Sequence, residues 1–225
     1  MPEQKSTPRP QAERVNNFLN GKKQVTETDA ALAIAYYPLL VALATRRRMI
    51  TFKAFVELAK ATCPDNPAVH NAIPVSTGRR LEFVRIFTAQ QDLPDLSAWV
   101  MGQNGKNSST FEKDFDPVKE RKRSSEVDWP MYQAAWDAHA AVLRKKAQKL
   151  KPRSRAEART MMSEIAQAMR PRIEAAIPNS NKLPYAQLVG PFRETILADI
   201  MSGLDPQEVL ENGLIDMRNN QLDQS

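Results

Sequence analysis

The chain has 225 residues, a formal net charge of +6 and a pI near 9.5. That length can bury a hydrophobic core in one or two domains, and the positive charge favours a polyanionic partner. The single cysteine, Cys63, excludes an intramolecular disulfide. The polar N-terminal segment has no apolar signal-peptide core, and the longest apolar run, Ala30–Ala44, is shorter than a membrane span requires. We therefore expect a cytoplasmic protein.

Shifts in composition divide the chain into four predicted segments. Residues 1–24 are polar and are predicted to be flexible, and residues 25–115 carry the signals of a DNA-binding domain. Residues 116–212 are predicted to form a helical domain for dimerisation or partner binding, strongly basic between 144 and 172. Residues 213–225 form a predicted flexible acidic tail, whose charge keeps it away from a surface that meets phosphate.

Two helices open the predicted DNA-binding domain. A threonine, Thr26 or Thr28, is placed to cap a helix over residues 29–47, and an acidic first turn matches the positive end of that helix dipole. A very short strand follows at residues 49–50, and Thr51 then caps a second helix whose apolar residues recur at helical spacing.

The helix predicted over residues 76–91 is the candidate DNA-reading element. Its apolar residues, Leu81, Val84 and Phe87, are spaced to form one buried face. That arrangement leaves three cations, Arg79, Arg80 and Arg85, facing solvent at and after the helix start. In a helix-turn-helix, long polar side chains at this position reach base edges or phosphates.

A strand and a hairpin are predicted after this helix. Apolar and polar residues alternate over residues 96–101, which is typical of a half-buried strand. Residues 102–110 supply glycine, asparagine and serine for a turn, and the return strand would begin at Thr110. The predicted fold is therefore mainly α: a winged helix-turn-helix with a small β-hairpin, followed by a helical C-terminal half.

The predicted DNA contacts fall into four groups. The start of helix 76–91 can hold a phosphate with hydroxyl and backbone N–H groups and reach bases with arginine, and the wing at 102–110 can meet the minor groove or the backbone. An arginine run and a basic helix can add phosphate contacts, although such cations also serve as solvated helix faces or offset a helix dipole. The residues are Ser76, Thr77, Arg79, Arg80 and Arg85; Lys106 in the wing; Arg46, Arg47 and Arg48; and Lys145, Lys146 and Lys149, with the run Lys119–Arg123 as an extension.

One stretch of the domain resembles a known family. ITFKAFVELAK at residues 50–60, followed by a turn, an arginine-bearing helix and a strand, looks like the small winged-helix domain of alkylguanine DNA alkyltransferases and alkyltransferase-like proteins. It also resembles stand-alone winged-helix proteins of bacterial mobile elements, over residues 48–111. The resemblance implies a DNA-binding fold. It argues against alkyl transfer, because the Pro-Cys-His-Arg acceptor box is absent and Cys63 has no His-Arg after it.

Signals for an enzyme are weaker. The two histidines, His70 and His139, are expected to be structural or surface residues, and no glycine-rich phosphate loop occurs. Asp95 after a proline, with Glu120 and Lys122 later in the chain, has the outline of a magnesium-dependent nuclease, but the glutamate lies in a helix-favouring run rather than on a strand.

The sequence therefore predicts a non-enzymatic, cofactor-free protein that binds double-stranded DNA, a regulator carried by a bacterium or a mobile element. A homodimer is expected, formed by the helical half through one of two apolar faces. The alternative is an adaptor that docks a protein partner through its basic helices; the magnesium-dependent nuclease is a further alternative. The two faces are Trp136, Ala140 and Leu143, or Leu188, Phe192, Ile196 and Ile200.

Overall fold

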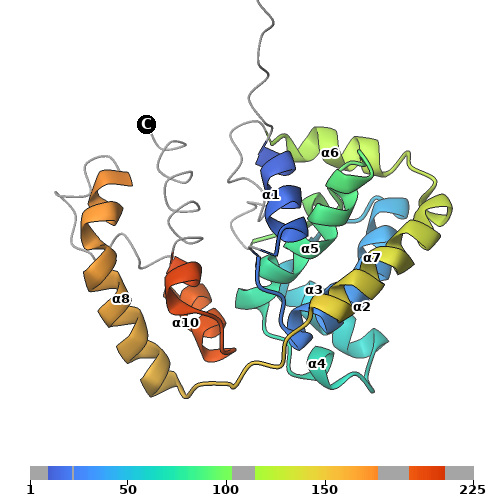
Figure 1. Cartoon of the computed structure of the whole chain (residues 1–225). Coiled ribbons are helices and arrows are strands. Elements are labelled where there is room, and N and C mark those ends of the chain that lie inside the picture. Colours follow the sequence, from blue (N-terminus) through green and yellow to red (C-terminus); the bar gives the residue numbers. More distant parts are fainter. Residues whose placement is uncertain (1–9, 22, 103–114, 177–192, 211–225) are drawn as a thin grey trace, which may run out of the picture. The chain divides into compact units, whose positions relative to one another are not determined.

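The computed structural model describes residues 10–21, 23–102, 115–176 and 193–210 (Figure 1). The chain forms two compact units, residues 1–148 (unit 1) and 149–225 (unit 2). The predicted mainly α fold is confirmed. The division between the units falls after Gln148 and not after residue 115, because the helices that follow residue 116 pack on those before them.

Where the structure describes it, unit 1 consists mainly of helices. Two very short strands, β1 and β2, form its sheet in the part that the structure describes. The helices are α1 (Pro10–Leu19), α2 (Glu27–Thr45), α3 (Phe52–Thr62), α4 (Pro67–His70), α5 (Thr77–Gln90), α6 (Pro117–Ser124) and α7 (Gln133–Lys146); the 3-10 turns are η1 (Pro74–Ser76), η2 (Leu96–Trp99) and η3 (Trp129–Tyr132); the strands are β1 (Ile50–Thr51) and β2 (Val100–Met101).

Helix α2 lies at the centre of unit 1. It begins with a capping box, in which the Thr26 hydroxyl accepts from the Asp29 N–H and the Asp29 carboxylate accepts from the Thr26 N–H. Pro38 neither divides nor ends the helix, and it is exposed. By length and composition α2 could cross a membrane. However, 61% of its apolar 18-residue stretch is buried inside the fold, as expected of a core helix.

Helices α5 and α7 complete the core around α2. Helix α5 packs against α1, α2, η1 and η2, and α7 lies over α2 (Figure 1). The Tyr37 ring of α2 stacks on Trp136 of α7 with centroids 4.0 Å apart, and Phe87 of α5 meets Trp136 edge to face. Such aromatic contacts add to the free energy gained from burial alone.

The predicted strand over residues 96–101 is wrong in its first part. Leu96–Trp99 forms the 3-10 turn η2, begun by the Asp95 carboxylate, which accepts from the Ser97 N–H. All residues from Leu96 to Val100 are buried, so the alternation in the sequence does not mark an exposed face. Only Val100–Met101 is extended, and it pairs in parallel with β1. The predicted return strand lies outside the described residues.

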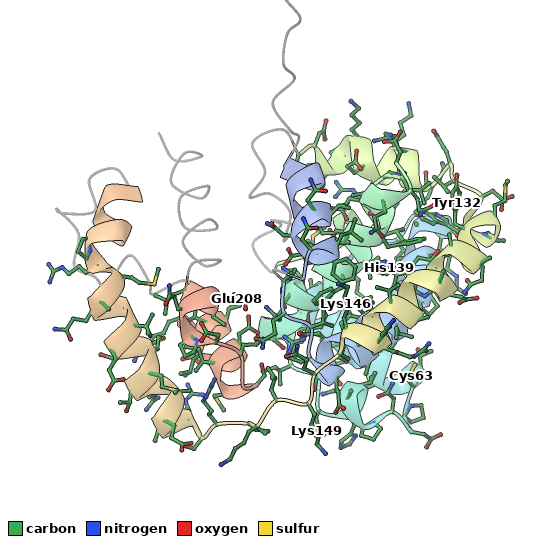
Figure 2. The ribbon with its side chains drawn as sticks, viewed as in Figure 1. Cys63, Tyr132, His139, Lys146, Lys149 and Glu208 are labelled. Atoms are coloured by element: carbon green, nitrogen blue, oxygen red, sulfur yellow. The ribbon has the colours of Figure 1, made fainter. Side chains whose placement is uncertain are left out.

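His139 is a structural residue at the junction of α1, α5 and α7 (Figure 2). Its ring nitrogens lie 3.1 Å from the Gln90 side-chain oxygen and 3.1 Å from the Phe83 carbonyl oxygen. Burial lowers the pKa of His139 to about 4, and the hydrogen bond to Phe83 offsets only part of that effect. The imidazole is therefore neutral at pH 7.

Because the pKa of His139 is lower in the folded than in the unfolded chain, the unfolded chain binds more protons between pH 6.5 and 4. Stability from this group is therefore complete above pH 6.5 and is lost as the pH falls towards 4. We expect the free energy of unfolding to drop by about 2 kcal/mol from pH 7.5 to 5 through this group alone. Urea unfolding of the protein and of His139→Gln at both pH values measures it; an equal drop in both proteins would contradict the assignment.

Unit 2 contains α8 (Arg155–Ala176), α10 (Arg193–Met201) and a helical segment at 206–210. Its apolar core joins the two helices, with Met162 and Met169 of α8 and Ile196 and Ile200 of α10 buried. The segment before α8 is anchored on the end of α10, where the Arg153 guanidinium donates to the Ile200 and Leu204 carbonyl oxygens at 3.1 and 2.6 Å.

Gly203 ends α10 in a conformation that L side chains rarely adopt, with φ +96°. A Cβ atom there would lie 2.6 Å from the Leu150 Cβ and 2.8 Å from the Lys151 carbonyl oxygen. We expect Gly203→Ala to destabilise unit 2 by more than about 1 kcal/mol, because strain and overlap act together. Thermal unfolding followed by circular dichroism measures the loss, with Gln167→Ala on the exposed side of α8 as a small-effect control. Equal melting temperatures of Gly203→Ala and the original protein would contradict this expectation, because the segment with Leu150 and Lys151 would then move aside without a measurable cost.

Candidate nucleic-acid interface

The predicted DNA-reading helix, α5, does not face solvent. No residue from Thr77 to Gln90 is exposed, because α1, α2, η1 and η2 surround the helix. The sequence predicts a buried face of Leu81, Val84 and Phe87, with Phe83 and Ile86 flanking it. All five are buried, and Phe83 and Ile86 pack in a second cluster with Phe18 and Val25 among others. The prediction that three α5 arginines face solvent is therefore wrong.

Two of these arginines bind one buried carboxylate. The Arg79 Nε lies 3.0 Å from Asp29 Oδ2 and the Arg80 Nε lies 3.1 Å from Asp29 Oδ1, with the three side chains 7%, 4% and 0% exposed. Arg79 also donates to the Gln24 carbonyl oxygen, and Arg80 to the Ser76 carbonyl oxygen. These bonds tie the start of α5 to the start of α2.

Burial by itself would raise the pKa of Asp29. The Arg79 and Arg80 guanidinium groups outweigh that effect, together with the hydrogen bond from the Thr26 N–H, so the pKa of Asp29 is lowered. Asp29 is ionised at neutral pH and is the counter-charge of both arginines. These three groups, which we call the Asp29 network, are consequently committed to the fold.

The remaining predicted contacts at the start of α5 are also engaged. Arg85 pairs with Asp95 at 2.8 Å, with side chains 11% and 7% exposed. The hydroxyls of Ser76 and Thr77 both donate to the Ile73 carbonyl oxygen, and both residues are buried. The start of α5 is thus closed by internal bonds and does not present a phosphate site.

The arginine run at the end of α2 has the opposite environment. Arg46, Arg47 and Arg48 are all exposed. Their backbone N–H groups cap the helix, with Arg47 donating to the Ala44 oxygen and Arg48 to the Leu43 oxygen, the pattern of a Schellman motif. Among the described residues, no hydrogen bond or ion pair is made by the three guanidinium groups.

Arg47 carries an unusual backbone for its residue type. Its φ is +52°, at the position of the Schellman motif that glycine usually fills. A non-glycine residue held in this region costs on the order of 1 kcal/mol. Asp92 does the same at the end of α5, but aspartate tolerates this conformation better than arginine does. Nothing in the cap requires the arginine side chain.

Helix α6 carries further exposed cations. It packs against α2 and η2, and Arg121 donates to the Ala98 carbonyl oxygen at 3.0 Å. Ala98 and Arg48 each precede a strand of the β1–β2 pair by two residues, which places them at the same end of that pair. Lys119 and Lys122 of α6 are exposed. We call Arg46, Arg47, Arg48, Lys119 and Lys122 the α2–α6 basic surface.

The other predicted cations have mixed placements. Lys145 at the end of α7 and Lys149 at the start of unit 2 are exposed. Lys146 donates to the Leu19 carbonyl oxygen and lies over the Phe18 ring, so it holds α1 in place. Lys106, and all of the predicted wing except Gly102, lie outside the described residues.

The two carboxylates of the nuclease alternative do lie side by side, in structural roles. Asp95 Oδ1 accepts from the Ser97 N–H while Oδ2 pairs with Arg85. Glu120 Oε2 accepts from the Asp95 N–H, and Oε1 pairs with Arg123. No cluster of three or more metal-binding side chains is found in the described part of the chain. The arrangement joins α6 to η2 and gives no support to the nuclease alternative.

No protein-family model, curated protein or solved structure matches this chain. Function is therefore inferred from its own residues. The arginine run and the α6 cations are evident in the sequence. Only the tertiary structure shows that they are exposed whereas the α5 arginines are buried and paired. Asp29, a counter-charge that Arg79 contacts, lies 50 residues earlier in the sequence.

The Asp29 network makes a strong stability prediction. Asp29→Ala leaves two buried guanidinium groups without their counter-charge, and we expect a loss of about 3–5 kcal/mol of unfolding free energy. The matched control is Glu27→Ala, which removes an exposed acid from the same helical turn and should change stability by about 0.5 kcal/mol or less. Urea unfolding followed by circular dichroism measures both; equal effects would show that Asp29 is not the anchor of α5.

Proposed function

We propose that this chain is a non-enzymatic DNA-binding protein that contacts the phosphate backbone of duplex DNA through the α2–α6 basic surface. The observation that carries the proposal is the run of three exposed arginines on the α2 end turn, one of them in a conformation that favours glycine. A residue that is kept in a strained backbone conformation, and whose side chain makes no bond that stabilises the fold, is a candidate for a functional role.

The chemistry of this surface suits phosphate. Arginine offers several N–H donors in a planar fork that matches phosphate oxygens, and exposed guanidinium groups without internal partners pay little to exchange water for phosphate. The two exposed lysines of α6 add point charges beside them. Cations on a turn and a short edge helix reach a backbone along one side of a duplex. The overall charge of +6 supports the same kind of partner.

A winged-helix framework is part of the proposal, in a modified role. The order α3, α5, β2 follows that of a helix-turn-helix with a strand after it, and β1 pairs with β2. In our proposal α5 is the central support of this framework rather than the helix that enters a groove. The cations that meet DNA lie at its edge, on α2 and α6. A regulatory role in a bacterium or a mobile element remains the expectation for a protein of this kind.

The test is fluorescence anisotropy with a labelled duplex at several salt concentrations. Replacing Arg46, Arg47 and Arg48 together by alanine should weaken binding at least about tenfold at 0.1 M salt and lower the slope of log K against log salt by about 2–3, since each phosphate contact contributes about 0.9. The control replaces Lys151, Arg155 and Arg159 of unit 2, which removes the same charge. Equal losses in both variants would mean that only net charge matters, and no binding by the unchanged protein would favour the adaptor alternative.

Arg47→Gly separates function from stability. Glycine fits the left-handed turn better than arginine, so the variant should be as stable as the original protein or more stable by up to about 1 kcal/mol. It should nevertheless bind DNA more weakly, because one phosphate contact is removed. Thermal unfolding and anisotropy on the same preparation give both numbers, and unchanged affinity would contradict a role for Arg47.

A further inference from the structure

Helix α7 presents an apolar face away from the core. Met131, just before the helix, is 76% exposed, and Val142 is 40% exposed. Between them lie Ala134, Ala138 and Ala141, all exposed and spaced at three or four residues along the helix. We call these five residues the outer face of α7. Large apolar side chains that are exposed on one continuous face mark a surface for association.

The dimer faces expected from the sequence lie elsewhere. Trp136, Ala140 and Leu143 occupy the opposite side of α7 and are buried in unit 1, so they are not available to a second copy. Ile196 and Ile200 are buried in unit 2. Leu188 and Phe192 lie outside the described residues. The amphipathic pattern of α7 was recognised correctly, but its buried side was assigned to the partner.

The charges beside the outer face indicate what covers it. Asp137 lies in the first half of α7, and Arg144 and Lys145 lie in the second half, all three exposed. Asp137 and Arg144 are seven residues apart, which is two helical turns, so they border the same side of the face. A helix laid antiparallel across this face must offer cations opposite Asp137 and an acid opposite Arg144. A second copy of α7 meets both conditions.

We propose that two copies of this chain pair through the outer face of α7, as an antiparallel helix pair with two-fold symmetry centred between Ala138 and Ala141. The small alanine side chains permit close approach of the two helices, and Val142 packs beside them. Asp137 of each copy lies next to Arg144 of the other, so the charge pair occurs twice. The proposal does not depend on DNA binding.

The size of the contact sets the expected affinity. One short helix per copy gives an interface at the small end of the range for specific complexes, so the dimer should dissociate in the micromolar range. Sedimentation velocity of the full chain, from below one micromolar to several hundred micromolar, should show a shift from monomer to dimer.

Three variants test the face and the direction of pairing. Asp137→Arg and Arg144→Asp, each alone, should raise the dimer dissociation constant about tenfold or more, because like charges then face each other twice. Combining both substitutions should bring the dimer dissociation constant back to within about threefold of that of the original protein, since the charge pairs re-form with their signs exchanged. Circular dichroism confirms that each variant, changed only at exposed positions, keeps its fold.

Ala138→Arg places a cation at the centre of the proposed contact and should abolish the dimer. The control is Ala61→Arg, the same substitution on the exposed side of α3. A chain that stays monomeric at the highest concentration overturns the proposal. So does a dimer that Ala138→Arg leaves intact, or one in which the combined charge exchange fails to restore pairing.

Discussion

The buried pairing of Asp29 with Arg79 and Arg80 is the interaction on which the architecture of unit 1 depends. It joins the first turn of α2 to the first turn of α5, and these are the two helices around which the other elements pack. Two arginines in an apolar interior would be costly without a carboxylate whose own hydrogen bonds fix its position. The capping box supplies that position, because Asp29 is also the N3 residue of α2. A local helix signal thus becomes the anchor of a long-range contact.

The fold was predictable in part, where it depends on local signals in the sequence. Helices α2 and α3 begin at the threonine caps that the sequence shows, Thr26 and Thr51, because such signals act over three or four residues. The parallel pairing of β1 with β2 was not predictable in this way. It depends on how the chain between them, residues 52–99, folds back, and a two-residue strand carries almost no pattern of its own. Leu96–Trp99 forms a 3-10 turn capped by Asp95 where a strand was predicted, and its burial on all sides shows that the alternation did not mark an exposed face.

The candidate site in the structure differs from the one predicted on α5, because burial is decided by contacts between residues that are distant in the sequence. The sequence alone does not distinguish an arginine at a helix start that points to solvent from one that pairs with a carboxylate 50 residues away. Composition points to arginine as the candidate side chain, but it could not choose between Arg79 on α5 and Arg47 on the α2 turn. The choice follows from burial and from the bonds that each guanidinium group already makes. The α6 cations were visible in the sequence, yet the contact of α6 with η2 and α2 is seen only in the tertiary structure.

If Arg47 contacts a polyanion as proposed, its left-handed turn places stability and binding in opposition at a single position. Selection for thermal stability alone would favour glycine there, and would remove a cation from the surface without harming the fold. Laboratory evolution that screens only for folded, heat-resistant protein should therefore drift towards glycine at this site, whereas evolution that also requires a polyanionic partner should retain a basic residue. Position 47 is where the two kinds of selection can be told apart from sequence data alone.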